Sequence, residues 1–88
     1  MNPQRTSQIR KSILTALKRA DGYALVDESL RSHVNGLTRP PIEDDEWTEH
    51  IQWLEETKRI VKVPCEIDET IVQWAITERG EGLLAKFN

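Results

Sequence analysis

The sequence predicts an α+β fold in which helices come first and a β-hairpin follows. Apolar residues recur with helical spacing through the first two thirds of the chain, and they alternate with a period of two between residues 61 and 76. The chain has 88 residues, of which 38% are apolar and 31% are charged, so it can bury one modest core. We therefore expect a single domain over residues 1–88, with fraying at residues 1–5.

The first predicted helix runs from about residue 4 to residue 20. Its apolar residues form one stripe with basic residues on both flanks. Asn2 and Pro3 offer an N-cap followed by a proline at the first helical position. Gly22 supplies a left-handed stop, and the bases of the last turn suit the helix dipole. The predicted stripe consists of Ile9, Ile13, Leu14, Leu17 and Ala20.

Two further helices are predicted after residues 23–26, which are expected to form an extended segment or a one-rung strand. The second helix has Asp27 as its N-cap and ends near Gly36. A rigid connector with two prolines leads to the third helix, which runs from about Glu43 to Thr57. Acidic residues crowd its first turn, where the dipole favours them. The predicted buried residues are Leu30, Val34 and Leu37 in the second helix and Trp47, Ile51 and Leu54 in the third, with His50 bordering that face and Trp53 to one side.

The period then changes from 3.6 residues to two, which predicts an antiparallel hairpin. Pro64 has no backbone donor and therefore indicates an edge strand or a bulge. Thr77 is expected to cap a last short helix through Phe87, which Gly80 and Gly82 weaken. The alternating apolar residues are Val61, Val63 and Cys65 in one strand and Val72, Trp74 and Ile76 in the other, with residues 66–70 at the tip.

The order of these elements is typical of one architecture. A two-stranded hairpin is not stable alone and needs a helical layer beneath it. Three helices with a hairpin closing one side form a winged helix, the variant of the helix-turn-helix in which the hairpin is the wing. We therefore predict a winged helix-turn-helix with a three-helix core, a two-stranded antiparallel wing and a short C-terminal helix.

Five short stretches carry a family resemblance, namely Ile13-Leu14, Gly22-Tyr23-Ala24-Leu25, Glu28-Ser29-Leu30, Trp53-Leu54-Glu55-Glu56 and Ile76-Thr77-Glu78-Arg79-Gly80. With these, the chain resembles the small winged-helix proteins of Mu-like transposable phages and prophages, which are loosely related to arsenical-repressor-type regulators. The resemblance covers roughly residues 9–85. It implies a phage or prophage origin and a DNA-binding regulator or accessory factor, and it brings no catalytic residues.

The charges are distributed unevenly along the chain. The formal net charge is −3, from 12 bases and 15 acids. Residues 1–41 hold seven bases and three acids, residues 42–57 hold seven acids and no base, and residues 58–88 hold five of each. The acidic block coincides with the third helix, which in a DNA-binding winged helix enters the major groove. Because phosphate attraction supplies most of the affinity for DNA, this placement disfavours ordinary major-groove readout.

Two candidate binding surfaces follow from this distribution. The third helix and the wing tip form a candidate face for a basic protein partner, although a solvated helix face explains the same acids. The first helix carries a candidate basic patch for nucleic acid or an acidic partner, and a solvated flank is again the alternative. Docking of the basic N-terminal half of one copy on the acidic third helix of another predicts a homodimer. The acidic candidates are Glu46, Glu49, Trp53, Glu56, Asp68 and Glu69, and the basic candidates are Arg5, Arg10, Lys11, Lys18 and Arg19.

Trp53 allows two interpretations. It packs under the hairpin, or it stays partly exposed beside the acids of the third helix and anchors a protein contact. Packing under the hairpin is the interpretation that we favour.

Several function classes are disfavoured by the sequence. No apolar stretch approaches a membrane span, and the N-terminus lacks the apolar region of a secretory signal, so we expect a cytoplasmic protein. The lone Cys65 cannot form an internal disulfide and fits a reducing compartment. His33, His50 and Cys65 do not have metal-ligand spacing. We find no phosphate loop and no pairing of a base with a nucleophile, and so expect neither an enzyme nor a cofactor.

Overall fold

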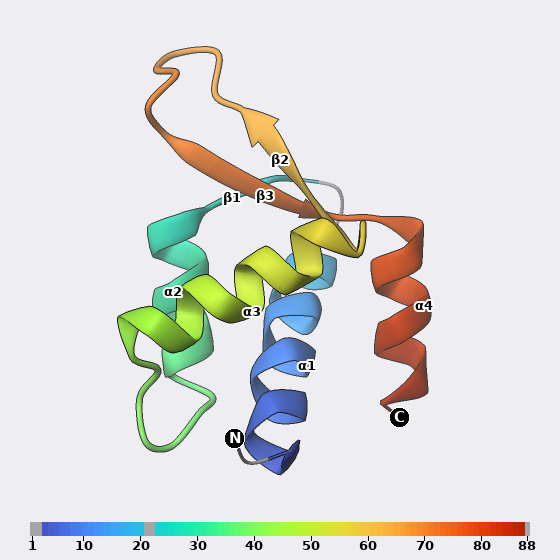
Figure 1. The fold of residues 1–88 in the computed structure, drawn as a ribbon. Coiled ribbons are helices and arrows are strands. Elements are labelled where there is room, and N and C mark those ends of the chain that lie inside the picture. The colour runs from blue at the N-terminus through green and yellow to red at the C-terminus, as the bar shows by residue number, and fades with distance from the viewer. Residues whose placement is uncertain (1–2, 21–22, 88) are drawn as a thin grey trace.

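Over residues 3–20 and 23–87, the computed structural model contains four helices and a three-stranded antiparallel sheet (Figure 1). This arrangement confirms the predicted α+β winged helix. The predicted N-cap at Asn2 and the predicted stop at Gly22 lie outside the described residues. In chain order the elements are α1 (Pro3–Arg19), β1 (Leu25–Val26), α2 (Asp27–Asn35), α3 (Asp44–Glu56), β2 (Ile60–Pro64), β3 (Val72–Ile76) and α4 (Glu78–Lys86).

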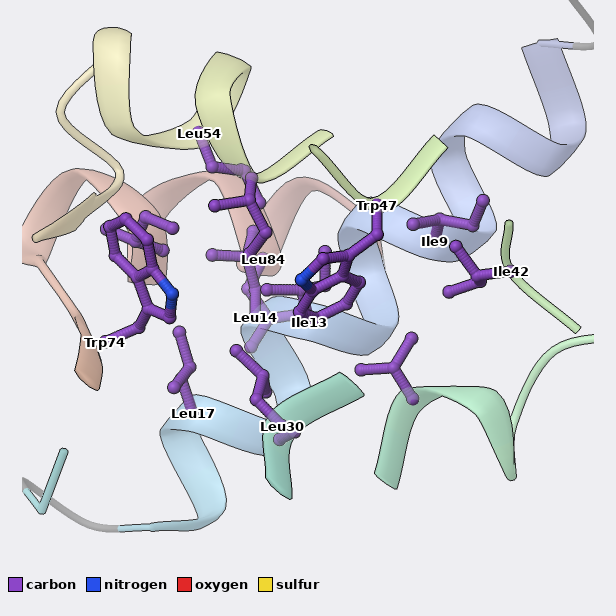
Figure 2. Close-up of a cluster of buried hydrophobic side chains, with 14 residues drawn as sticks. Ile9, Ile13, Leu14, Leu17, Leu30, Ile42, Trp47, Leu54, Trp74 and Leu84 are labelled. Carbon is purple, nitrogen blue, oxygen red and sulfur yellow. The ribbon is translucent and has the colours of Figure 1, made fainter. Parts of the chain in front are cut away.

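The core is built around α1, which contacts α2, α3, α4 and β3. Its predicted stripe is confirmed from Ile9 to Leu17, because the apolar side chains there are almost completely buried. Figure 2 shows how side chains from the other helices and from β3 converge on this stripe. Burial of these apolar surfaces is the main favourable term in the stability of the fold. The core consists of Ile9, Ile13, Leu14, Ala16, Leu17, Leu30, Val34, Ile42, Trp47, Ile51, Leu54, Ile60, Trp74 and Leu84.

The sheet contains one strand more than the predicted hairpin. Its order is β1-β3-β2, so β3 is the central strand, and the extended segment before α2 pairs with it through Leu25 and Trp74. β2 is therefore an edge strand, which confirms the interpretation of Pro64. The strand pairing ends at Pro64 and Val72, and the loop between them projects beyond the helical layer in Figure 1.

Two predicted apolar positions do not face the core. In β2 the buried residue is Ile60, which pairs with Ile76, whereas Val61 is 47% exposed. The alternation at residues 61–65 thus located the strand, but Val61 lies on the face opposite Ile60, because successive side chains of a strand point to opposite sides. Leu37 is 46% exposed, because α2 ends at Asn35 and the chain has turned away from the core.

The C-terminal end of α3 and the N-terminal end of α4 connect these helices to the sheet. Beyond α3, Lys58 has a left-handed backbone with φ of 64°. The Lys58 N–H donates to the Glu55 carbonyl, and the Arg59 N–H donates to the Leu54 carbonyl, which together form a Schellman motif. At α4, the Thr77 hydroxyl accepts from the Gly80 N–H at 3.1 Å and confirms the predicted cap. The chain therefore leaves α3 and enters α4 in fixed directions.

Gly80 allows α4 to approach closely the residues at the base of the wing, Arg59 before β2 and Ile76 at the end of β3. A Cβ at this position would lie 2.2 Å from the Arg59 carbonyl oxygen and 2.8 Å from Ile76 Cγ1. Gly82, also in α4, has open space around the same point. The two glycines that weaken this helix by propensity therefore differ in role, and only Gly80 is required by packing.

Substitution of each glycine by alanine tests this difference. Gly82→Ala should raise the free energy of unfolding by about 1 kcal/mol, because alanine is the better helix former. Gly80→Ala should lower it by about 2 kcal/mol, because the added methyl group must displace backbone. Urea unfolding of the two variants measures both values. Equal stabilisation by the two substitutions would contradict the close approach.

Candidate functional site

The outward face of α3 is acidic. Asp45, Glu49, Gln52 and Glu56 follow one another at spacings of four, three and four residues, so they share one side of the helix. All four side chains are exposed. Of the acidic candidates on this helix, Glu49 and Glu56 lie on this face. An outward face with three carboxylates and one amide presents hydrogen-bond acceptors and negative charge to a partner.

The wing tip continues this acidic character. Glu66, Asp68 and Glu69 are all exposed, and Ile67 between them is 95% exposed. The Asp68 carboxylate accepts from the Thr70 N–H at 2.9 Å and from the Thr70 hydroxyl at 2.7 Å, and these two bonds lower the pKa of Asp68. We define the acidic face as the outward carboxylates of α3 and those of the wing tip: Asp45, Glu49, Glu56, Glu66, Asp68 and Glu69.

Glu46 does not belong to this face, because it is paired with α1. The Arg5 Nε and Nη2 atoms donate to its two carboxylate oxygens at 2.7 Å and 2.9 Å. These bonds, together with a bond from the Glu43 N–H, lower the pKa of Glu46 to about 2. Arg5, a basic candidate, and Glu46, an acidic candidate, thus form an ion pair with each other. A second bridge of the same kind joins Arg31 of α2 to Asp44 at 2.6 Å.

Arg10, His50 and Trp53 form a cluster between α1 and α3. The Arg10 Nε donates to His50 Nδ1 at 3.2 Å, and the Arg10 guanidinium lies 3.7 Å from the centre of the Trp53 ring. The guanidinium of Arg59 lies 4.8 Å from the same ring. His50 is only 1% exposed, and burial followed by the charge of Arg10 lowers its pKa. Trp53 is partly buried against the core, with the guanidinium groups of Arg10 and Arg59 over its ring.

The basic candidates of α1 are thus divided. Arg5 and Arg10 are engaged within the chain, whereas Lys11, Lys18 and Arg19 are exposed. The structure therefore leaves three exposed bases on α1 for an outside partner.

Asp27 has a different role from the predicted N-cap. The N-cap of α2 is Val26, and no side chain caps the helix. Instead, the Asp27 carboxylate accepts from the Trp74 indole at 2.9 Å and from the Trp47 indole at 3.1 Å and 3.3 Å. Both indoles are 96% buried, so each N–H needs an acceptor inside the protein. That requirement is the one sequence signal that could have pointed to this carboxylate.

A groove of about 560 Å³ opens beside these indoles, between α3 and the wing. It is bounded by the start of α2, by one side of α3 and by the strands of the wing. Its walls come together only in the tertiary structure, so no local pattern in the sequence indicates it. We call it the α3–wing groove, and define it by Asp27, Glu28, Trp47, Ile51, Glu55, Lys62 and Trp74 among its lining residues.

Neither a metal-binding cluster nor a membrane-spanning helix is found in the described part of the chain. Within residues 3–20 and 23–87, no group of three His, Cys, Asp or Glu side chains is placed to hold a metal ion. The helices found there are too short or too polar to cross a membrane. Cys65, in the same part of the chain, is a free cysteine.

Comparison with known proteins identifies the fold. No protein-family model and no curated protein matches the sequence. The solved structures that match include three with TM-scores of 0.69 to 0.70: AdcR from Streptococcus pyogenes (16% identity, 90% of this chain and 51% of that one), a mutant of ZitR from Lactococcus lactis (20%, 99% and 53%) and a mutant of MarR from E. coli complexed with operator DNA (12%, 94% and 57%). The chain therefore spans about half the length of these relatives.

These neighbours are winged-helix regulators, and the present chain has their fold. At such low identity the likeness extends to the fold alone. The phage origin implied by the sequence resemblance gains no support from these structures.

Removal of the Asp27 carboxylate should destabilise the fold. Asp27→Ala leaves two buried indole N–H groups without an acceptor, so the free energy of unfolding should fall by about 2–4 kcal/mol. Asp27→Asn should cost less, because its amide oxygen can still accept both bonds. Urea unfolding followed by tryptophan emission measures these losses. The neighbouring exposed Glu28→Ala is the control and should change the value by about 0.5 kcal/mol or less; an equal loss there would exclude the special role of Asp27.

The Arg5–Glu46 pair should make stability depend on acid pH. Because the pKa of Glu46 is lowered from 4.5 to about 2, the pair stabilises the fold above pH 4.5, and this contribution is lost as the pH falls toward 2. Glu46→Gln keeps the capping shape without the charge. Wild type should therefore be more stable than this variant at pH 6, and the difference should vanish near pH 2 in urea titrations. Arg5→Gln should show the same profile, and a constant difference would contradict the pairing.

Proposed function

We propose that this chain is a regulatory winged-helix domain whose acidic face binds a basic segment of another protein. The observation that carries the proposal is the outward side of α3, where Asp45, Glu49 and Glu56 are exposed beside a single amide, Gln52. Its regulatory class is supported by the fold that it shares with AdcR, ZitR and MarR.

Electrostatics argues against the major groove as the partner of this face. Duplex DNA carries about one negative charge per 1.7 Å of axis, and proteins that bind it neutralise phosphates with lysine and arginine. The third helix of a DNA-binding winged helix meets the bases, and arginine or lysine makes the commonest specific contact there. α3 contains no lysine or arginine, and the wing tip that would contact the backbone adds Glu66, Asp68 and Glu69. Like charges placed opposite one another cost several kcal/mol.

A basic protein segment complements the same face. Carboxylates at the rim attract the partner and raise the association rate, while an exposed apolar side chain such as Ile67 supplies contact area. The ion pairs of Arg5 with Glu46 and of Arg31 with Asp44 do not include the outward carboxylates of α3. The acidic face is therefore available to an outside cation.

DNA binding is the second candidate function. It is favoured by the likeness to MarR, which was solved in complex with operator DNA. In this candidate the exposed bases Lys11, Lys18 and Arg19 of α1 contact phosphates, and the phage or prophage origin implied by the resemblance supplies the setting.

Charge reversal on α3 separates the two functions. The probes are a random 20-base-pair duplex and an acetylated heptapeptide of one central arginine, four flanking lysines and terminal glycines, each measured by fluorescence anisotropy at low salt. Wild type should bind the peptide and should not bind the duplex more tightly than about 100 μM. The double variant Glu49→Lys with Glu56→Lys should bind the peptide about tenfold more weakly than wild type, or weaker still.

The matched control is Glu78→Lys with Glu81→Lys, which makes the same charge change at exposed positions of α4. It should bind the peptide within about twofold of wild type. Duplex affinity that falls steeply with salt and is weakened by Lys11→Glu with Lys18→Glu would overturn the proposal in favour of DNA binding.

A further inference from the structure

The α3–wing groove lies between the two parts of the acidic face and differs from them in chemistry. We propose that this groove receives an arginine side chain of the basic segment, held between the indole floor and the carboxylates of α2 and α3. The inference rests on the proposed function and adds to it a defined pocket, a preferred residue and a set of atoms. It does not follow from the acidic face itself, because Asp27, Glu28 and Glu55 lie outside that face.

The floor of the groove is apolar and rigid. Trp47 and Trp74 are each 4% exposed and Ile51 is 7% exposed, so they present edges and small patches of ring and methyl surface. Figure 2 shows the two indoles on neighbouring parts of the core, one from α3 and one from β3. A guanidinium is planar and weakly hydrated, so it packs against such a surface at a lower desolvation cost than an ammonium group does.

Asp27 places a fixed carboxylate at the edge of this floor. The Trp47 and Trp74 indole N–H groups donate to the Asp27 carboxylate and hold it in one orientation. A carboxylate offers about four acceptor positions, so further donors can be accommodated. A pre-oriented acceptor loses little conformational entropy on binding, which favours a donor that arrives from solvent.

The remaining charges of the groove favour a cation. Glu28 at the start of α2 and Glu55 on α3 both line it, against the single base Lys62. The guanidinium carries five N–H donors and no acceptor, and it binds carboxylates through two parallel bonds. The groove thus combines acceptors on two walls with an apolar floor between them.

Lys62 shows that the floor already admits a cation from the chain itself. It pairs directly with Trp74 across β2 and β3, and its Nζ lies 5.8 Å from the centre of the Trp74 ring. An incoming arginine must share this space with the Lys62 ammonium. Removal of the Lys62 charge should therefore strengthen binding, a sign opposite to that expected for loss of the Glu55 carboxylate.

The test uses the arginine–lysine heptapeptide and a matched peptide with citrulline, the neutral isostere of arginine, at the centre. The 88-residue chain labelled with ¹⁵N is titrated with each peptide, and the indole N–H resonances of Trp47 and Trp74 are followed together with the backbone amides of α3. The arginine peptide should shift both indole resonances and bind about tenfold more tightly than the citrulline peptide.

Isosteric variants assign the binding to the groove. Glu55→Gln should weaken binding of the arginine peptide about tenfold and abolish the preference of the protein for arginine over citrulline. Lys62→Gln should strengthen binding of the arginine peptide about two- to fivefold, as estimated for charge-assisted bonds. The control is Glu56→Gln, which removes the adjacent carboxylate on the outward face and should leave the preference for arginine unchanged. The backbone amide spectrum of each variant reports whether it is folded.

The outcomes distinguish this inference from the proposed function. If the arginine and citrulline peptides bind equally and shift only amides of the outward face, the proposal that the groove binds arginine is overturned. The proposal that the acidic face binds a basic segment is then still supported. If neither peptide binds and the duplex does, both are overturned. A preference for arginine that is lost in Glu55→Gln and kept in Glu56→Gln supports the groove.

Discussion

The Asp27 carboxylate is the interaction on which the arrangement of this winged helix depends. It lies at the start of α2 and binds Trp47 of α3 and Trp74 of β3, so one side chain joins three elements that are far apart in the sequence. The indole N–H groups are buried donors, and without this acceptor each would lose its hydrogen bond. Because Trp74 lies in the central strand, the same contact also sets how the wing stands relative to α3. The groove between them is a product of that geometry.

Part of the uneven charge of the chain is balanced inside the molecule. Arg5 binds Glu46, Arg31 binds Asp44, and Arg10 stacks on Trp53, so the basic N-terminal half supplies counter-charges and cation–π partners to the acidic helix. The acids that remain unpaired by these bridges are gathered on the outward side of α3 and at the wing tip. An interaction that the sequence suggested between two copies of the chain is thus present, at these two pairs, within a single copy.

Local patterns predicted the helices and the wing, and tertiary contacts determined the rest. The stripe of α1, the buried face of α3 and the Thr77 cap depend on residues within a few positions of one another, and the structure confirms them. The pairing of Leu25 with Trp74 spans the whole domain, so two residues of extended chain could not be assigned to the sheet beforehand. At the candidate site, Glu49 and Glu56 were proposed from the distribution of charge along the chain, whereas Asp27 and the groove depend on contacts between distant elements.

The strands of the wing attach it to the rest of the protein, because Gln73 and Trp74 of β3 pair with β1. Strand pairing runs from Ile60 and Ile76 to Pro64 and Val72, and the hydrogen bonds of Asp68 connect it to Thr70 and Ile71 within the tip. The exposed residues at the tip therefore contribute little to folding. Such a loop can change in length and sequence while the framework stays constant, so homologous chains can acquire different partners by exchange of this segment alone. In protein engineering, the same property makes the tip a suitable position for a grafted recognition peptide.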